Sequence, residues 1–479
     1  MNRNLLCGSL LGTGACLAAA LPAVAAGTGE RPNILFIVAD DLGWGDVGYH
    51  GSVIPTPNID ALAARGIEMN RFYTAPVSSP TRAGLMTGRY PSRFGIRKTV
   101  IPPWRDYGLD PEEQTLADML AANGYAHRAI VGKWHLGHGR RAYYPLNRGF
   151  THFYGCLNGA LDYFTHEREG ELDWHNDWES CRDEGYSTDL IADEAVRCIG
   201  EYASEGPFFL YVAFNAPHTP FQAPEDEIAE HISSEKFAAL TPREKDAYTY
   251  RAMVTRMDKG VGRILEKLER SGLVENTLVL FMSDNGGLAS EPAWRDGELH
   301  TQNYPLNSGK GSLYEGGIRE PMIVKWPGVV SPGTRCDKYL MIEDFYPTIL
   351  EMAGVQNYRT VQPLDGTSFM PLLKGTGDPS KGRAIVWNFP NIWGNNGPGI
   401  NLNCSIRKDE WKLVYYYETG KKELFNIPED IGEKHDVAAQ HPDIVKRLSK
   451  ELGTYLRNVG GQRPGFKATN KPCPWPDEV

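Results

Sequence analysis

Polar side chains follow four strongly apolar runs of this sequence, and they are of the types that bind metals or transfer protons. They are Asp40 and Asp41 after the first run, Lys133 and His135 after the second, His218 after the third, and Asp284 and Asn285 after the fourth. Ligands of open α/β sheets bind at the carboxyl ends of the strands. If the four runs are strands of one sheet, these side chains meet at a single edge.

Each of these residues taken alone has a simpler structural explanation. Asp and Asn are frequent helix caps and Asx turns, and a histidine is more often a hydrogen-bonded packing residue than a catalyst. Their combination after four strands favours a site instead. Carboxylates and a carboxamide are hard oxygen ligands, and the set lacks cysteine, so it favours Ca²⁺ or Mg²⁺ over zinc. Ligands from two separate loops give an irregular geometry, which calcium tolerates better than magnesium.

A second group of candidates is cationic. Arg82, Lys133 and Lys310, the last within Ser308-Gly-Lys-Gly-Ser312, would add positive charge beside the metal. Cations gathered near a hard metal indicate a multiply oxygenated anion such as sulfate or phosphate, whose charge is spread over several oxygens in the transition state. The sequence therefore predicts transfer of such a group.

The residues around these positions alternate between strand-length apolar runs and amphipathic helical patterns. The apolar runs lie at 33–39, 126–131, 208–214, 277–282 and 321–325. The helical patterns lie at 57–66, 80–88, 114–123, 188–203, 244–271 and 343–353. Such alternation predicts an α/β domain over residues 27–380, with a large, mostly parallel sheet sandwiched by helices.

The chain changes character after about residue 380. Apolar runs at 384–388 and 411–417 are typical of antiparallel strands around a loop rich in Gly, Asn and Pro, and a helical pattern covers 442–458. We therefore predict a small C-terminal α+β subdomain, ending in a tail, over residues 381–479.

The composition bounds the class of protein. The chain has 479 residues, of which 41% are hydrophobic, enough for one large core and a smaller second one. A formal net charge of -10, without long runs of like charge, argues against nucleic acid or an anionic membrane as the main partner. An anionic substrate would then be held by local positive charges.

The first 26 residues have the pattern of a secretory signal peptide. Arg3 precedes an apolar run, and Ala23-Val-Ala-Ala26 supplies the small residues of a cleavage site. No later segment of the sequence is long and apolar enough to span a membrane. We expect an exported protein, periplasmic or secreted, without stable membrane insertion.

Six cysteines remain beyond this segment, and none has the spacing of a metal site. Export permits a disulfide. Cys156 with Cys181 is the first pair to consider because both flank one polar insertion, and buried free thiols are the alternative.

The segment Ser78-Ser-Pro-Thr-Arg82, followed by Leu85-Met-Thr-Gly-Arg89, resembles the signature of the type I sulfatases. In that family the first Cys or Ser of Cys/Ser-x-Pro-x-Arg is oxidised to formylglycine (3-oxoalanine). Further segments that resemble the family lie at 32–43, 132–137, 281–287 and 309–321. The resemblance implies an alkaline-phosphatase-like α/β fold. It also implies a formylglycine-generating maturation enzyme, of the radical type because the signature begins with Ser.

The resemblance also implies roles for the polar residues. Asp40, Asp41, Asp284 and Asn285 would bind one Ca²⁺ together with the modified Ser78. Arg82 and Lys133 would hold the formylglycine, His135 would contact its second hydroxyl, and His218 and Lys310 would grip the sulfate near the leaving oxygen. The structural alternative for Ser78 is an N-cap, since Ser78 or Ser79 before Pro80 is a good helix start.

The chemistry implied by the family explains why an aldehyde is needed. Hydrated formylglycine is a geminal diol, one oxygen of which, deprotonated by the metal and Asp284, attacks sulfur while the alcohol leaves with a proton from His218 or Lys310. The second hydroxyl then loses its proton to His135, and sulfate is expelled by C–O cleavage. An unmodified serine has no second hydroxyl through which sulfate could be expelled, so unmodified Ser78 should give little turnover.

The substrate is less well defined by the sequence. Residues 153–166 resemble a loop of N-acetylgalactosamine-4-sulfatases and arylsulfatase B-like enzymes. Because sugar sites use aromatic and forked polar side chains, the candidates for a carbohydrate subsite are Asp162, Tyr163, His166, Trp294, Arg295, Asp296 and His300.

We expect an exo-acting sulfatase for a glycan that carries sulfated galactose or N-acetylgalactosamine. The alternatives are a 6-O- or 3-O-specific sugar sulfatase, a general arylsulfatase, a phosphate mono- or diesterase of the alkaline phosphatase superfamily, and a non-catalytic binding protein on the same fold.

Overall fold

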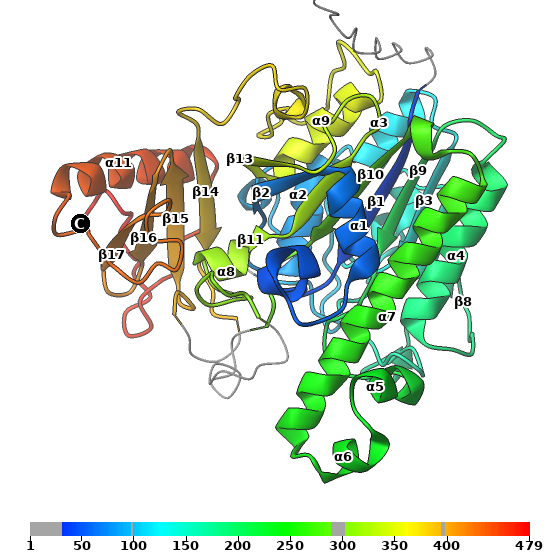
Figure 1. Cartoon of the computed structure of the whole chain (residues 1–479). Coiled ribbons are helices and arrows are strands. Elements are labelled where there is room, and N and C mark those ends of the chain that lie inside the picture. Colours follow the sequence, from blue (N-terminus) through cyan, green and yellow to red (C-terminus); the bar gives the residue numbers. More distant parts are fainter. Residues whose placement is uncertain (1–30, 97–98, 289–301, 394–397) are drawn as a thin grey trace, which may run out of the picture.

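The centre of the molecule is β1 (Asn33–Ala39), a strand whose seven residues are all buried. In the computed structural model the described residues are 31–96, 99–288, 302–393 and 398–479 (Figure 1). The predicted signal segment and the subsite candidates Trp294, Arg295, Asp296 and His300 lie outside them. A strand that is apolar at six successive positions, as β1 is from Ile34 to Ala39, must be covered on both faces.

The strands on either side of β1 form a mixed sheet of 11 strands. In parallel with β1 run β10 (Thr277–Ser283) on one side and, on the other, β9 (Phe208–Ala213), β3 (His127–Gly132) and β4 (His152–Gly155). The antiparallel β12 (Met322–Lys325) joins β10 to β2 (Ile67–Tyr73). The outer strands are β13 (Thr334–Met341), β11 (Arg319–Glu320), β7 (His175–Asn176) and β8 (Glu179–Ser180). The predicted mixed, mostly parallel α/β sheet is confirmed.

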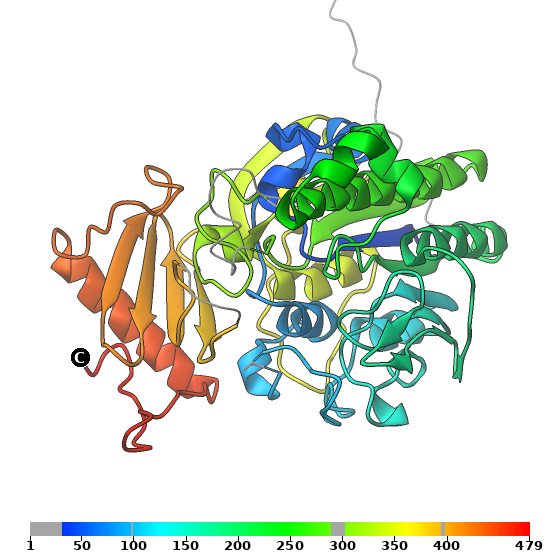
Figure 2. The same ribbon diagram turned by 90° about the horizontal axis from the view of Figure 1, so that it is seen from below.

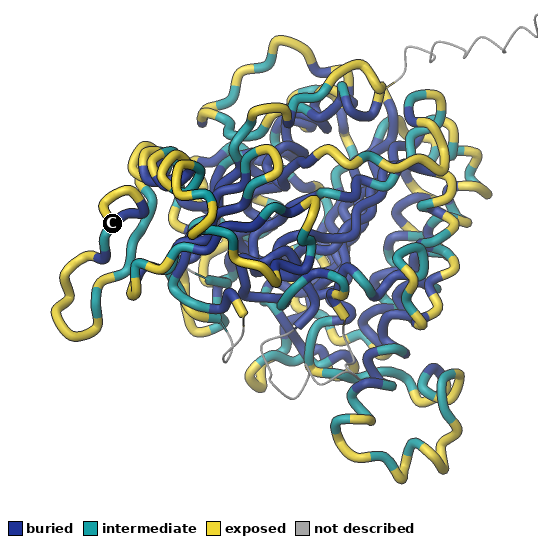
Figure 3. Tube along the Cα trace, turned by 60° about the vertical axis from the view of Figure 1, so that its left-hand side comes forward, coloured by how far each residue is buried: buried dark blue, intermediate teal, exposed yellow. Residues whose placement is uncertain are grey.

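Helices cover both faces of this sheet, as Figures 1 and 2 show. Leu35 and Ile37 of β1 pack in one cluster with α1 (Pro57–Arg65), α4 (Ser187–Tyr202) and α7 (Pro242–Arg270). Phe36 and Val38 point to the other face, where α2 (Ser78–Thr87), α3 (Leu116–Ala122) and α9 (Phe345–Met352) pack. The alternation follows from the two-residue period of a strand. Figure 3 shows the buried residues gathered along these inner strands.

A second, four-stranded antiparallel sheet stands beside the first (Figure 2). It consists of β14 (Ala384–Phe389), β15 (Asn403–Lys408), β16 (Trp411–Tyr416) and β17 (Lys422–Asn426), with α11 (Pro442–Asn458) against β15 and β16. The small C-terminal α+β unit is therefore confirmed. The division of the chain at residue 380 stays a prediction.

Short elements complete the fold. They are α5 (Glu225–His231), α6 (Ser234–Ala239), α8 (Glu315–Ile318), α10 (Met370–Leu373), β5 (Glu167–Arg168) and β6 (Glu171–Leu172). None of the helices in the described part of the chain is long and apolar enough to cross a membrane.

The predicted Cys156–Cys181 disulfide is wrong. All six cysteines of the described residues are free thiols. The sulfur of Cys156 faces the carbonyl oxygen of Asn158, and that of Cys181 faces the carboxylate of Asp183. Each thiol therefore points to a polar group of its own segment and not to the other thiol.

Candidate active site

Backbone hydrogen bonds tie the ends of neighbouring strands together at one edge of the large sheet. The amide of Asp40 donates to Ala216 O at 3.0 Å, and the amide of Asp284 donates to Ala39 O at 3.1 Å. The amide of Lys133 donates to Ala213 O at 2.8 Å. The polar residues after β1, β3, β9 and β10 therefore meet, as the sequence predicts.

Ser78 is the first residue of α2, and its side chain turns toward these strand ends. The N-cap position is Val77, without a side-chain cap, so the capping interpretation of Ser78 is wrong. The Ser78 Oγ lies 3.1 Å from Asp40 Oδ1, 3.3 Å from Asn285 Oδ1 and 3.2 Å from Lys133 Nζ. A buried hydroxyl is thus held among a carboxylate, a carboxamide oxygen and an ammonium group.

The neighbouring Ser79 does not cap the helix either. Its hydroxyl donates to His135 O at 3.0 Å and accepts from the amide of Ile101 at 3.0 Å. It therefore fixes the backbone on which His135 is carried.

Three buried carboxylates of the site are each paired with a buried cation. Asp40 Oδ2 lies 2.5 Å from Lys133 Nζ, both oxygens of Asp41 lie 2.7 Å from Lys310 Nζ, and Asp284 Oδ2 accepts from Arg82 at 3.0 and 2.8 Å. Asn285 Nδ2 also donates to Asp41 Oδ1 at 2.7 Å. Because removing either partner would leave a buried charge, each pair depends strongly on both members.

The cations decide the protonation of the carboxylates. Burial favours the neutral acid, but Lys133, His218 and Arg82 offset it and hold the pKa of Asp40 below its usual value. For Asp41, burial is likewise offset by Lys310 and His218, and the pKa is lowered. Both carboxylates are therefore ionised at neutral pH.

The donor set fits a hard divalent cation. Ligand atoms of Asp40, Asp41 and His218 lie within 4.8 Å of one another, and Asn285 Oδ1 faces the same space from beside Ser78. The three carboxylates and three cations of the site balance. A sulfate monoester and an ionised oxygen nucleophile would add two negative charges, which a divalent cation would neutralise.

His135 follows β3 in a left-handed backbone conformation, with φ of 59°. Its Nε2 lies 3.2 Å from Ile101 O, and its buried Nδ1 has no partner among the described residues. Burial, followed by Lys133 and Arg82, holds the pKa of His135 well below its usual value. The ring is therefore neutral, and Nδ1 is free to accept a proton when Nε2 carries the hydrogen.

His218 is the more accessible histidine, with 15% of its side chain exposed. Its Nδ1 lies 2.6 Å from Thr219 O, a carbonyl that can only accept, so Nδ1 carries a hydrogen. Nε2 then faces Asp41 Oδ2 at 3.6 Å. Burial and the nearby Lys310 lower the pKa of His218 despite Asp41.

The described subsite candidates mainly organise their own loop. Asp162 Oδ1 accepts from the amides of Phe164 and Thr165 at 2.9 and 2.8 Å, and its Oδ2 accepts from Gln222 at 2.6 Å. Tyr163 and His166 are buried. Neither of these two side chains offers much surface to a sugar in this structure.

Two residues outside the predicted set also touch the site. The ammonium of Lys310 lies 4.8 Å from the ring centre of Trp393, a residue that follows β14 of the second sheet. Gly159 packs so closely on the His135 ring that an added Cβ would lie 2.3 Å from it. Sequence reasoning missed both because neither stands directly after one of the four runs that end at the site, and neither residue is of a type that binds a metal or moves a proton.

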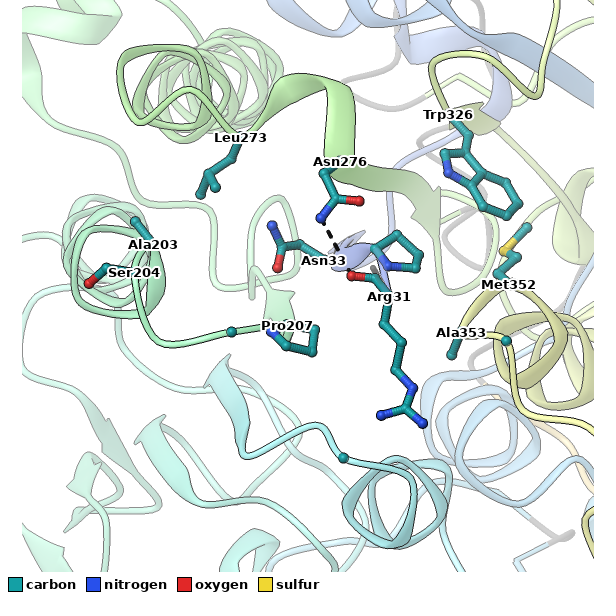
Figure 4. A pocket seen from close by; sticks show the side chains of 14 residues that line it. Arg31, Asn33, Ala203, Ser204, Pro207, Leu273, Asn276, Trp326, Met352 and Ala353 are labelled. Carbon is teal, nitrogen blue, oxygen red and sulfur yellow. Dashed lines mark hydrogen bonds between the residues drawn. The ribbon is translucent and has the colours of Figure 1, made fainter. Parts of the chain in front are cut away.

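A cavity of about 910 Å³ lies at the opposite edge of the sheet, where β1 begins (Figure 4). Arg31, Asn276 and Trp326 are among the side chains around it, and Asn276 Nδ2 donates to Arg31 O at 3.4 Å. No carboxylate or histidine is found among its described lining residues. Its lining shares nothing with the polar cluster around Ser78.

Two family models match overlapping parts of the chain. The model described as Sulfatase matches residues 32–355, and the one described as N-sulphoglucosamine sulphohydrolase, C-terminal, matches residues 308–458.

Similar proteins span most of the chain. Arylsulfatase J of Mus musculus is 33% identical over 91% of this chain and 77% of its own length. N-acetylgalactosamine-6-sulfatase of Homo sapiens is 32% identical over 93% of this chain and 90% of its own length. The crystal structure of Ps i-CgsB in complex with k-i-k-neocarrahexaose has a TM-score of 0.78 and 34% identity over 89% of this chain and 93% of that one.

Proposed function

The chain belongs to the sulfatase family, whose members hydrolyse sulfate esters, and on that premise we propose that Ser78, converted to formylglycine, is its nucleophile. The observation that supports this most strongly is the position of Ser78 Oγ, buried against Asp40, Asn285 and Lys133. A serine with only a capping role would direct its hydroxyl to the backbone of its own helix. This one is directed at the charged groups of other segments.

We further propose that Asp40, Asp41, Asp284 and Asn285, with position 78, hold one Ca²⁺. Calcium would supply Lewis acidity and positive charge beside the nucleophile. Formylglycine would supply, as its hydrate, an oxygen nucleophile with a second hydroxyl through which sulfate can leave. Asp40 and Asp41 are ionised in the described site, as metal ligands need to be.

The remaining polar groups hold charge and move protons. The Arg82 guanidinium is fixed by two hydrogen bonds to Asp284 and donates to Lys133 O at 3.1 Å, so it presents a rigid positive charge beside position 78. The free Nδ1 of neutral His135 accepts a proton there. On the exposed side, Lys310, or His218 once its Nε2 is protonated, gives the leaving oxygen its proton.

The sugar class is supported by the names of the relatives. One is named for N-acetylgalactosamine 6-sulfate, and another was crystallised with a neocarrahexaose. We propose that this protein is an exported, exo-acting sulfatase for galactose or N-acetylgalactosamine sulfate within a glycan. The first name favours the 6-O ester.

The maturation of Ser78 can be tested directly. Peptide mass spectrometry of active protein from its native host should show the loss of two hydrogen atoms at Ser78. Active enzyme with an unmodified Ser78 peptide would overturn the nucleophile.

The reaction class needs a second measurement. Sulfate and phosphate esters of one alcohol should be compared on the wild-type protein and on Ser78→Ala. We expect a higher kcat/KM for the sulfate ester and no turnover by Ser78→Ala. A preference for the phosphate ester would overturn the sulfatase assignment for this chain.

A further inference from the structure

The segment at 99–106 passes directly beside the nucleophile. The amide of Ile101 donates to Ser79 Oγ at 3.0 Å, and its carbonyl oxygen lies 3.2 Å from His135 Nε2. One residue of the segment thus contacts both the neighbour of Ser78 and a histidine of the site. The segment is therefore anchored next to the site at Ile101.

The tip of this segment is a turn closed by the amide of Arg105, which donates to Pro102 O at 3.1 Å. Trp104 lies within the turn and is 72% exposed. It is three residues from Ile101, so its Cα is at most about 11 Å from that of Ile101. A large indole is therefore presented to solvent close to the site.

A second loop packs against this tip and adds positive charge. A Cβ on Gly139 would lie 2.5 Å from the Cα of Asp106, so the two loops are in contact. The Nε2 of His138 lies 3.0 Å from Pro103 O, which joins the loops again. Arg140, with 66% of its side chain exposed, lies 4.0 Å from Asp106.

These residues form a strip, which we define as Trp104, Arg105 and Arg140 with the adjacent exposed Arg141. Asp106 lies beside the strip and offsets one of its three arginine charges, on a chain whose net charge is -10. Arg141 lies 5.5 Å from the ring centre of Trp178, which restricts its side chain. The guanidinium group of an exposed arginine can bind a multiply oxygenated anion through two parallel hydrogen bonds, and an exposed indole offers a flat apolar face to a sugar ring.

We propose that the strip binds a second sulfated sugar of the same glycan chain, adjacent to the sugar whose ester is cleaved. The indole of Trp104 packs against the apolar face of that sugar, and the guanidinium groups of Arg105 and Arg140 bind its sulfate. This inference rests on the proposed function and deepens it: the substrate is a glycan that carries more than one sulfate.

The experiment compares two substrates on the mature, full-length enzyme. One is a galactose-based oligosaccharide with a sulfate on every repeating unit, and the other is the monosulfated monosaccharide. The variants are Trp104→Ala and the double variant Arg105→Ala/Arg140→Ala. The matched control is Arg447→Ala, which removes an exposed arginine of α11 on the second sheet.

An exposed ion pair contributes at most about fivefold in affinity. The double variant removes two arginines that would pair with sulfate, so it should lower kcat/KM for the oligosaccharide by about tenfold. Trp104→Ala should lower it by about fivefold. The monosaccharide should be hydrolysed equally well by every variant. For the wild type, raising the ionic strength should remove the arginine contribution on the oligosaccharide alone.

Equal losses on both substrates, or no loss on the oligosaccharide, would overturn the proposal. Its failure can be told apart from failure of the proposed function by measuring binding in a Ser78→Ala background. There the sulfated oligosaccharide should bind more weakly when the strip is altered, even if no sulfate ester is ever turned over. Unchanged binding there rejects the strip, whereas absent hydrolysis by mature wild-type protein rejects the function.

Discussion

The hydroxyl group of Tyr163 lies 2.7 Å from the carbonyl oxygen of His218, so a residue after β4 holds the backbone of a histidine that follows β9. The same hydroxyl lies 2.7 Å from Asn215 O. Burial keeps the pKa of Tyr163 well above its usual value, so the phenol stays a hydrogen-bond donor at any working pH. Tyr163 therefore positions the turn that carries His218.

Removing this hydroxyl should slow the enzyme without unfolding it. In Tyr163→Phe we expect kcat/KM for a sulfate ester to fall by about three- to tenfold, since one hydrogen bond contributes about 0.5–1.5 kcal/mol. The control is Tyr186→Phe, because Tyr186 stacks on Tyr163 but donates to Gln222 O. Equal losses in the two variants would contradict a specific role for Tyr163.

Tyr163 also shows where sequence reasoning ends. A run such as 34–39 is apolar at every position, so it must be a covered strand, and the residue after it must lie at the sheet edge. That logic places Asp40 and Asp284 correctly. The direction of a side chain within a loop has no such period, so Tyr163 is expected at a sugar although it faces the backbone of His218.

The same limit applies to strands without an apolar run. β13 (Thr334–Met341) is mostly exposed over its first half, and no hydrophobic pattern marks it there. Its position comes from pairing with β2 across a register shift between Cys336 and Tyr339. Ser78 is a similar case. Its place at the start of a helix is compatible with a side chain that turns back to its own helix, and the local sequence does not show that the hydroxyl turns toward Asp40 instead.

Gly159 should be essential to the position of His135. In Gly159→Ala the new methyl group would lie 2.3 Å from Cε1 and 2.4 Å from Nε2 of the ring, so the ring has to move. A displacement near 1 Å at a catalytic group costs on the order of a hundredfold in rate. Kinetics should be compared with Gly377→Ala, whose Cβ would meet Pro371 at an ordinary 3.5 Å. Full activity of Gly159→Ala would exclude His135 as a proton acceptor.

Calcium should both stabilise and activate the protein. Chelation should abolish turnover and lower the Tm, and added Ca²⁺ should restore both more fully than Mg²⁺, which demands a stricter geometry. At a free concentration one hundred times the Kd, the gain is about 2.7 kcal/mol of unfolding free energy. Asp41→Asn should shift the calcium dependence of the Tm to higher concentration. An Asp41→Asn protein with unchanged calcium dependence would remove this residue from the ligand set.

Glu343 should make the fold less stable as the pH rises. Burial raises the pKa of Glu343 to about 8, and its Oε1 has no partner among the described residues. In the unfolded chain a glutamate ionises near pH 4.3, so between these two values the folded state holds one more proton. The unfolding free energy then falls with rising pH, by up to about 1.4 kcal/mol per unit.

Glu343→Gln carries no charge at any pH and should remove this slope. The Tm difference between the variant and the wild type should be small at pH 5 and should favour the variant by pH 8. Glu351→Gln, an exposed neighbour on the same segment, is the control. A difference that stays constant from pH 5 to 8 would show that Glu343 does not titrate in this range.

The second sheet should be needed for the position of Lys310. Glu315 begins α8, five residues after Lys310, and its Oε1 lies 3.0 Å from Lys412 Nζ of β16. The same ammonium lies 2.8 Å from Glu433 Oε1, and all three side chains are buried. One lysine of the C-terminal unit therefore helps to hold the segment that presents Lys310, the proposed catalytic lysine.

Lys412→Met leaves Glu433 without its cation and leaves Glu315 with only the more distant Arg319 and Arg407, at 3.6 and 3.8 Å. We expect a loss of about 3–5 kcal/mol of unfolding free energy. kcat/KM should fall as well, because the α8 segment is released. Lys408→Met on the neighbouring β15 breaks a partly exposed pair with Glu451 and should cost less than about 1 kcal/mol. Adding Glu433→Gln to Lys412→Met removes the unpaired charge of Glu433. The double variant should recover part of the lost unfolding free energy and part of the lost kcat/KM. If the double variant is no better than the single one, the charge of Glu433 is not what destabilises Lys412→Met, and Lys412 acts through packing instead.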